Sequence, residues 1–230
     1  MSVSYEVDGG VATITLASPE TRNVLTASTM TLLHDYLGDA AVDDGVRVIV
    51  LTGEGSTFCA GADLAGAAAA DADPDAASFA STGPAALVAV LEAMLDHPKP
   101  IIARVQGHVA GGGNGLVAAA DISVAAESAR FAFSEVRVGV APAVISVVCL
   151  ARMRATDARE LLLTGERVSA ERVREAGLVT SDRRGQWIFY RIAPGVAERL
   201  AGIARTLVPG GLMTVSDLAA TRSSAARPSA

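Results

Sequence analysis

Hydrophobic and polar side chains near the start of the chain follow patterns typical of β-strands. Residues 4–7 and 11–16 alternate apolar and polar side chains on either side of the turn-forming residues 8–10, and this arrangement predicts a β-hairpin. Residues 46–51 are rich in β-branched side chains, which is typical of a strand buried on both faces. The chain therefore begins with strand structure.

Apolar side chains at helical spacing predict helices after and between these strands. Thr26 can cap a helix whose apolar face runs as far as Leu37. Residues 84–95 have the same spacing, and the two prolines within residues 97–100 end that helix. A short strand is predicted over residues 122–125, and further helices over residues 143–153, 156–163 and 169–176. Strands that alternate with helices predict an α/β fold.

The central stretch, residues 105–121, contains a glycine cluster. The apolar run 100–105 predicts a buried strand before it, Gly111, Gly112 and Gly113 follow, and residues 116–120 predict a helix of small residues. A strand, a glycine turn and a helix start leave backbone N–H groups free at the positive end of a helix dipole. Such a place binds a phosphate or an oxyanion that develops during a reaction.

A second glycine-rich segment, residues 53–64, follows the strand predicted at 46–51. If Gly61-Ala62 and Gly111-Gly112 each aim one N–H at the same point, they form an oxyanion hole. Glu135, on a third loop, is then a candidate acid or base for proton transfer beside a thioester carbonyl. The spacing also fits a plainer interpretation, in which the glycines mark tight turns and Glu135 is a surface carboxylate.

Composition predicts a globular protein with a sizeable core and without a membrane span. Half of the 230 residues are hydrophobic, which suffices for a core in one domain or two small ones. No run of 18 apolar residues predicts a membrane span, and the N-terminal residues do not resemble a secretory signal. Cys59 and Cys149 are too few for a disulfide framework, so we expect buried thiols in a cytoplasmic protein.

Several other chemistries lack their motifs. The glycine cluster does not match the dinucleotide-binding pattern G-x-G-x-x-G, and no G-x-S-x-G nucleophile motif occurs. His34, His97 and His108 are scattered, without the spacing of a metal site. We therefore expect no metal and no bound nucleotide cofactor.

The net charge of −6 conceals a difference between two segments. Residues 1–180 carry 12 Lys and Arg against 22 Asp and Glu, whereas residues 181–230 carry 7 against 3. The acidic first segment disfavours nucleic acid as a partner. Only residues 181–230 carry a net positive charge, which binding to nucleic acid requires.

Five segments, taken in order, resemble the enoyl-CoA hydratase/isomerase (crotonase) family over residues 1–180. These segments are residues 22–26, 58–64, 109–113, 120–121 and 133–142. The resemblance implies a spiral core of ββα units that binds an acyl-CoA thioester. It also implies an oxyanion hole formed by the N–H groups of Ala62 and Gly112, with Glu135 as the catalytic acid or base.

The resemblance also implies a binding surface and an assembly. Substrate-binding positions carried over by the motifs are Arg22, Val24, Ala60, Gly61, Ala62, Asp63, Leu64, Gly111, Gly112 and Ser134. No cofactor is implied beyond the CoA that forms part of the substrate. Family members form trimers or hexamers, so a homo-oligomer is expected.

One departure from the family concerns catalysis. Hydratases of this family commonly hold the attacking water between two glutamates; Glu135 matches one of them, but the other position falls on Gly115. Some family members combine such a glycine with a run like residues 141–146. A single glutamate suffices in principle for double-bond isomerisation. The alternative is a CoA-thioester-binding pseudoenzyme.

The second departure concerns residues 181–230. Residues 178–180 and 187–190 flank a polar turn and predict a hairpin, followed by a helix over 195–208 and disorder over 216–230. A resemblance to the wing and last helix of ArsR-type winged-helix repressors is carried by residues 174–180 and 185–192, without the recognition helix of that family before them. The sequence thus predicts a truncated crotonase-like core, residues 1–180, with an atypical hairpin-helix tail. A fusion with a DNA-binding regulator is the third alternative.

Overall fold

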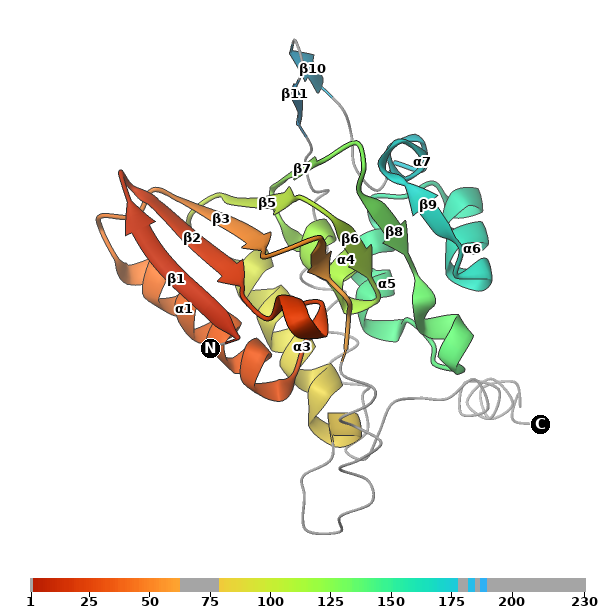
Figure 1. Cartoon of the computed structure of the whole chain (residues 1–230), viewed down its shortest axis with the longest axis horizontal. Helices are drawn as coiled ribbons and strands as arrows, with labels where there is room; N and C mark the ends of the chain where they lie inside the picture. The colour runs from red at the N-terminus through yellow and green to blue at the C-terminus, as the bar shows by residue number, and fades with distance from the viewer. Residues whose placement is uncertain (1, 63–78, 178–181, 185–186, 190–230) are drawn as a thin grey trace, which may run out of the picture.

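The computed structural model describes residues 2–62, 79–177, 182–184 and 187–189. Two β-sheets form its framework (Figure 1). The first has the strand order β1-β2-β3-β5-β7, and only its β1–β2 pair is antiparallel. Its strands are β1 (Val3–Asp8), β2 (Val11–Leu16), β3 (Val48–Gly53), β5 (Ile101–Val105) and β7 (Ile122–Ala125).

The second sheet has the order β4-β6-β8-β9. Its strands are β4 (Thr57–Cys59), β6 (His108–Ala110), β8 (Arg130–Ala132) and β9 (Arg167–Ser169). The β8–β9 pair is antiparallel and the other pairs are parallel. Each strand has three residues, too few for an alternating pattern to stand out in the sequence. The sequence analysis missed this second sheet for that reason.

The chain visits the two sheets in turn and then forms a helix, which confirms the expected spiral of ββα units. Successive units are β3, β4 and α3 (Phe79–Leu95); β5, β6 and α4 (Gly112–Ala119); and β7, β8 and α5 (Ala143–Leu150). Helices α3 and α4 each form part of a crossover between parallel strands of the first sheet, β3 to β5 and β5 to β7. The remaining helices are α1 (Ala27–Val42), α6 (Ala155–Thr164) and α7 (Ala170–Glu175), with the 3₁₀ turns η1 (Pro19–Thr21) and η2 (Ser134–Val138).

Local sequence signals account for the first elements. Gly9 and Gly10 have φ values of 55° and 86°, as the tight turn between β1 and β2 requires. The side chain of Thr26 accepts a hydrogen bond from the Thr29 N–H at 3.1 Å, so the predicted cap of α1 is confirmed. Both cysteines are buried and free.

Two predictions about the glycine turns were wrong. Helix α4 begins at Gly112 rather than at residue 116, because burial of the whole helix compensates for the weak helix propensity of glycine. The strand immediately before each glycine turn belongs to the second sheet, β4 or β6, and not to the buried strands β3 and β5. These short strands carry the chain from the first sheet to the glycine turns.

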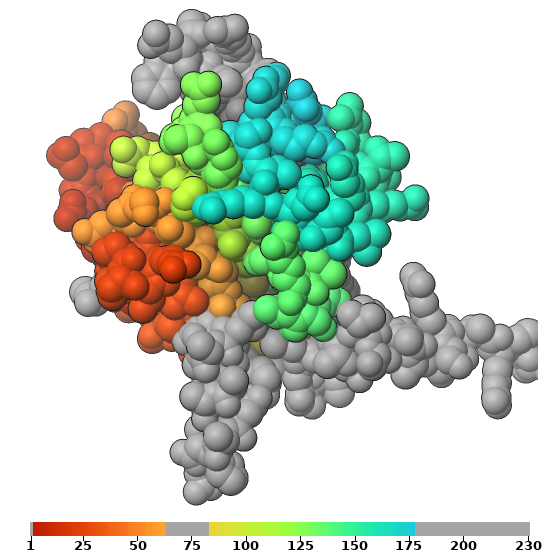
Figure 2. All heavy atoms as spheres, turned by 45° about the vertical axis from the view of Figure 1, so that its right-hand side comes forward, coloured from red at the N-terminus to blue at the C-terminus, as the bar shows by residue number. Residues whose placement is uncertain are grey.

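All eight residues of α4 are buried, between α3 on one side and α5 on the other. In Figure 2 the N-terminal elements, in red and orange, and α6 and α7, in cyan, lie on opposite flanks of the molecule. Helix α4 therefore lies within the core, and its position is fixed by packing from several elements.

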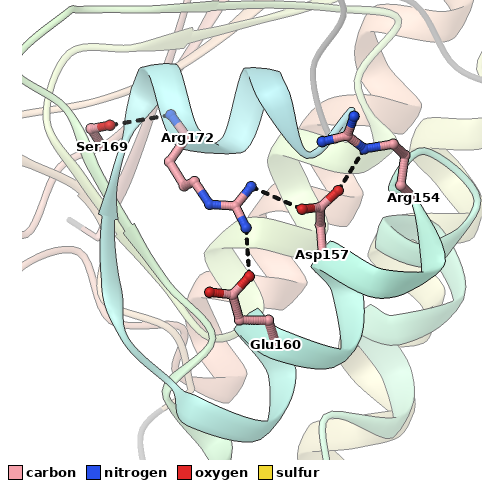
Figure 3. A network of polar contacts seen from close by, with 5 residues as sticks. All are labelled: Arg154, Asp157, Glu160, Ser169 and Arg172. Carbon is pink, nitrogen blue, oxygen red and sulfur yellow. Dashed lines mark hydrogen bonds and ion pairs between the residues drawn. The ribbon is translucent and has the colours of Figure 1, made fainter.

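Helices α6 and α7 are joined by a network of charged side chains (Figure 3). Asp157 accepts hydrogen bonds from Arg154 at 2.6 Å and from Arg172 at 3.0 Å, and Arg172 also donates to Glu160 at 2.6 Å. Ser169, at the end of β9, caps α7 by accepting from the Arg172 N–H. This network fixes the helices that follow the spiral core.

The segment after residue 180 contains a hairpin, as predicted, but its first strand lies later in the sequence than expected. Strands β10 (Asp182–Arg184) and β11 (Trp187–Phe189) are antiparallel, and β11 lies against β7 (Figure 1). The sequence analysis had assigned residues 182–184 to the turn. Predictions were also made for residues 178–180, 195–208 and 216–230, which lie outside the described residues. Among the helices that the structure describes, none is both long and apolar enough to cross a membrane.

Candidate functional site

The two glycine turns touch each other. Gly61 has φ +90°, and a Cβ atom built on it would lie 3.0 Å from the Ala110 carbonyl oxygen and 3.3 Å from the Gly112 nitrogen. A side chain at this position would therefore push the turns apart, and its backbone conformation also favours glycine. The sequence analysis predicted that these turns meet, and the structure brings them together.

The first turn is held by Asn23, which is 1% exposed. Its amide nitrogen donates to the carbonyls of Glu54 at 2.9 Å and Thr57 at 2.7 Å, and its oxygen accepts from the Ser18 N–H at 2.9 Å. The bonds to Glu54 and Thr57 join residues 31 and 34 positions apart in the sequence. Asn23 thus fixes the loop before α1 against the strand that leads to the turn.

Backbone hydrogen bonds continue this attachment up to the turn. Ala60 donates its N–H to the Arg22 carbonyl at 3.0 Å, and Leu25 donates to the Gly61 carbonyl at 2.7 Å. Leu25 and Ala62 form a parallel bridge. The Ala62 N–H belongs to the same trans peptide group as the Gly61 carbonyl, and the two point in opposite directions. Since this carbonyl accepts from Leu25, the Ala62 N–H faces away from Leu25.

The second turn starts α4. Gly111, with φ +48°, donates its N–H to the Ala132 carbonyl at 3.1 Å. Gly112 is the first helical residue, and within the described part of the chain its N–H has no hydrogen-bond acceptor. Such an N–H at a helix start is available to an anionic group.

Both turns line a largely apolar pocket with a volume of about 210 Å³. Of the residues expected at the site, Ala60, Gly61, Ala62, Gly111, Gly112, Ser134 and Glu135 line it. Arg22 and Val24 do not line it, although they lie on the loop attached to the first turn. Asp63 and Leu64 lie outside the described residues.

Much of the apolar lining was not recognised in the sequence. It includes Leu25, Met30, Leu87, Val140, Pro142 and Ile145, and the exposed Arg137 also lines the pocket. The run after Glu135 was a usable signal, since residues 137–145 all lie within ten positions of the candidate base. The contributions of α1 and α3 had no local signal, because apolar residues at helical spacing are typical of any core.

Glu135 lies in η2, next to Gly111 of the second turn. A Cβ atom on Gly111 would lie 3.4 Å from Glu135 Oε1 and 3.5 Å from the Gly61 Cα. Burial raises the pKa of the Glu135 carboxyl above its usual value. Its Oε2 is buried and has no hydrogen-bond partner among the described residues. A carboxyl group in such surroundings can accept and return a proton nearer to neutral pH than an exposed one.

The position opposite this carboxylate in the family pattern, Gly115, faces apolar side chains. A Cβ atom there would lie 3.0 Å from Ile145 Cγ2 and 3.5 Å from Leu91 Cδ1. Among the described residues, Glu135 is the only acidic residue that lines the pocket. In the same part of the chain, no three His, Cys, Asp or Glu side chains gather into a potential metal site. The pocket can therefore offer one titrating carboxylate and two backbone donors.

Comparisons with known proteins show to which family the chain belongs. Residues 6–182 match the family model described as enoyl-CoA hydratase/isomerase. A putative enoyl-CoA hydratase of Thermus thermophilus is 36% identical over 171 residues, which cover 74% of this chain and 67% of that protein. The trans-2-decenoyl-[acyl-carrier-protein] isomerase of Streptococcus mutans is 34% identical over 180 residues, covering 77% of this chain and 67% of that protein.

A solved structure extends the similarity to the fold. The crystal structure of an enoyl-CoA hydratase from Mycobacterium avium superposes with a TM-score of 0.69 at 36% identity, covering 97% of this chain and 81% of that one. The fold is therefore crotonase-like, as the sequence predicted. With a family match over residues 6–182 and relatives above 30% identity, this chain belongs to the enoyl-CoA hydratase/isomerase family.

Proposed function

We propose that this chain catalyses proton transfer on an acyl-CoA thioester, as an enoyl-CoA hydratase or isomerase. The observation that carries the proposal is the position of Gly111: a Cβ atom on it would lie 3.5 Å from the Gly61 Cα and 3.4 Å from Glu135 Oε1, so the first turn and the carboxylate meet beside the second turn. Two backbone donors and one carboxylate next to an apolar pocket match what the chemistry of an α,β-unsaturated thioester needs.

In the proposed mechanism, the N–H groups of Ala62 and Gly112 bind the thioester oxygen. In isomerisation, removal of a proton from the carbon next to the thioester places negative charge on this oxygen. In hydration, the same charge develops when the oxygen of water adds to the following carbon, and it is discharged when a proton is delivered to the carbon next to the thioester. Two aligned donors stabilise this enolate more than the neutral substrate. Glu135 delivers or removes the proton. No cofactor takes part beyond the CoA carried by the substrate.

The binding surface that we propose follows the two turns. Its members are Arg22, Val24, Ala60, Gly61, Asp63, Leu64, Gly111 and Ser134, together with the two donor residues. We further propose a cytoplasmic homo-oligomer, trimeric or hexameric as in the family, with residues 1–180 as the catalytic core and residues 181–230 as a separate tail.

A second candidate function is thioester binding without turnover. It is favoured by the surroundings of Gly115, where Ile145 and Leu91 occupy the space next to the missing side chain. Without a second carboxylate, hydration depends on Glu135 alone to orient and activate the water. Double-bond isomerisation needs only one group to shuttle the proton.

Turnover of Glu135→Gln on a panel of enoyl-CoA substrates tests the proposal. The substitution keeps the shape of the side chain and removes proton transfer, so we expect kcat to fall about 10²–10⁴-fold. Binding of a saturated acyl-CoA, measured by calorimetry, should change little. Glu175→Gln, an exposed glutamate on α7, is the matched control and should behave as the wild type.

The same panel separates the alternatives. A wild-type chain that binds acyl-CoA but turns over none of the hydration or isomerisation substrates would support the pseudoenzyme instead. Equal turnover by Glu135→Gln and the wild type would remove Glu135 from the mechanism.

A further inference from the structure

Asn114, the third residue of α4, connects the helix start to the strand before Glu135. Its side chain is 0% exposed. Its amide nitrogen Nδ2 donates to the Ala132 carbonyl at 2.8 Å and contacts the Gly111 carbonyl at 3.3 Å. The Ala132 carbonyl also accepts the Gly111 N–H at 3.1 Å. One carbonyl oxygen therefore holds both the glycine turn and the first turn of the helix.

Ala132 is the last residue of β8, and Glu135 follows three positions later in η2. The bonds from Gly111 and Asn114 thus fix the start of η2 relative to the start of α4. The start of η2 carries the Glu135 carboxylate, and the start of α4 carries the Gly112 N–H. In the proposed reaction, both groups must face the same substrate. The pairing of β6 with β8, in which Ala110 lies opposite Ala132, brings the two starts together.

The amide oxygen of Asn114, Oδ1, indicates that the residue does more than stabilise the fold. Both contacts of Nδ2 are to carbonyl oxygens, which sets the orientation of the amide group. Its Oδ1 is then buried without a hydrogen-bond partner in the described part of the chain. An unsatisfied buried acceptor costs about as much stability as a hydrogen bond returns. The net stability gained from Asn114 is therefore small, while its position is strictly defined.

We propose that Asn114 is a positioning residue, which sets the Gly112 N–H and the Glu135 carboxylate at the separation the reaction needs. This inference rests on the proposed function of the site. Catalytic groups must be held within fractions of an ångström, and a displacement of about 1 Å can cost about 10²-fold in rate.

The test compares Asn114→Leu and Asn114→Ala with Ser123→Ala. Leucine keeps the branched shape of the asparagine side chain. Alanine is the second variant because it fits the buried site even if leucine prevents folding. Ser123 is 1% exposed, and its hydroxyl donates to the Val117 carbonyl at 2.8 Å. It is the matched control, because it binds the same helix through one buried side chain, away from the helix start.

For both Asn114 variants we expect kcat to fall about 10- to 100-fold, with KM changed less than about threefold, and the midpoint of the kcat–pH profile to move. Ser123→Ala should lower the unfolding midpoint but keep kcat and the pH profile. The proposal is overturned if the folded Asn114 variants keep kcat, or if Ser123→Ala shows the same kinetic changes.

A readout that needs no turnover separates this inference from the function on which it rests. The pKa of Glu135, followed by the NMR shift of its labelled carboxyl carbon, should change in Asn114→Ala and not in Ser123→Ala. A wild-type chain that is inactive on every substrate contradicts the proposed function. In that case an unchanged Glu135 pKa in Asn114→Ala would also overturn the positioning role.

Discussion

Gly112 illustrates how a missing side chain can shape the site at the scale of a single residue. A Cβ atom there would lie 3.1 Å from Leu25 Cδ1 and 3.3 Å from Leu87 Cδ2. Both leucines line the pocket, so any side chain at Gly112 would grow into the space next to the proposed thioester oxygen. Gly61 and Gly111 are restricted in a different way, because their positive φ values are strained for other residues.

Replacing Gly112 with valine should therefore damage catalysis more than folding. We expect kcat/KM to fall at least about 10²-fold, the scale of losing one oxyanion donor, because the side chain displaces the thioester from the N–H. The measurement is steady-state turnover together with circular dichroism of the variant. Gly38→Val is the control, since a Cβ atom on Gly38 has no neighbour within 4 Å. Near-normal turnover of a folded Gly112→Val protein would exclude this donor from the mechanism.

At the scale of elements, interactions between loops and helix ends hold the spiral in place. Lys99, the only lysine in the chain, donates to the carbonyls of Ala40 at 2.7 Å and Asp43 at 2.6 Å, at the end of α1. A cation there satisfies carbonyls that have no partner within the helix and complements the helix dipole. The Asp157 network has a similar role between α6 and α7 (Figure 3).

The pKa of Asp157 gives this network a predictable pH dependence. The hydrogen bond from Arg154 is the largest cause, with that from Arg172 in support, of a pKa below the usual value for an aspartate. Because the folded pKa is lower than the unfolded one, the network stabilises the protein fully above the unfolded pKa and loses this effect as pH falls through the folded pKa.

We therefore expect Asp157→Asn to lower the thermal unfolding midpoint at neutral pH. The difference from the wild type should shrink as the pH falls below the usual aspartate pKa and vanish below the folded pKa. Thermal unfolding followed by circular dichroism over a pH series measures it. Asp44→Asn, an exposed residue without an ion pair in the described structure, should show no such trend. If the difference in unfolding midpoint between the wild type and Asp157→Asn stayed constant with pH, the charge of Asp157 would not be the source of the stabilisation.

At the scale of the whole molecule, charge is divided unevenly between the core and the tail. Residues 1–180 are acidic and residues 181–230 are basic. The proposed reaction needs none of the basic residues after residue 180. The backbone of β11 lies against β7, the last strand of the first sheet, so part of the tail is in contact with the core.

We accordingly expect the tail to support the core rather than bind nucleic acid. Deleting residues 181–230 should expose the surface next to β7 and lower solubility or change the oligomeric mass, measured by light scattering. The full-length chain should show no nanomolar affinity for duplex DNA at physiological salt. A deletion protein with unchanged mass, solubility and activity would show that the tail is dispensable. Salt-dependent nanomolar binding that is lost in Arg183→Ala/Arg184→Ala would favour the regulator fusion instead.

Much of the fold could be predicted from local sequence signals. Gly9 and Gly10 indicated the turn of the first hairpin, Thr26 indicated the start of α1, and the ordered motifs indicated the family. The start of α4 was not predicted, because three glycines have weak helix propensity and become helical only within the core. The residues proposed for catalysis were likewise named from motifs alone, and their roles stay predictions.

The sequence by itself determined the alternation of strands and helices, the positions of the glycine turns and the identity of the candidate base. These features depend on residues that are close together in the sequence, because side chains return to the same face every 3.6 residues in a helix and every second residue in a strand. Only the tertiary structure decided which turns touch, what surrounds Gly115 and how deeply Glu135 is buried. It also revealed the polar contacts of Asn23 and Asn114, which join segments up to 34 residues apart. Such contacts form only when the two sheets bring distant parts of the chain together. The residues near Asn23 or Asn114 in the sequence do not indicate which distant carbonyls these side chains will meet.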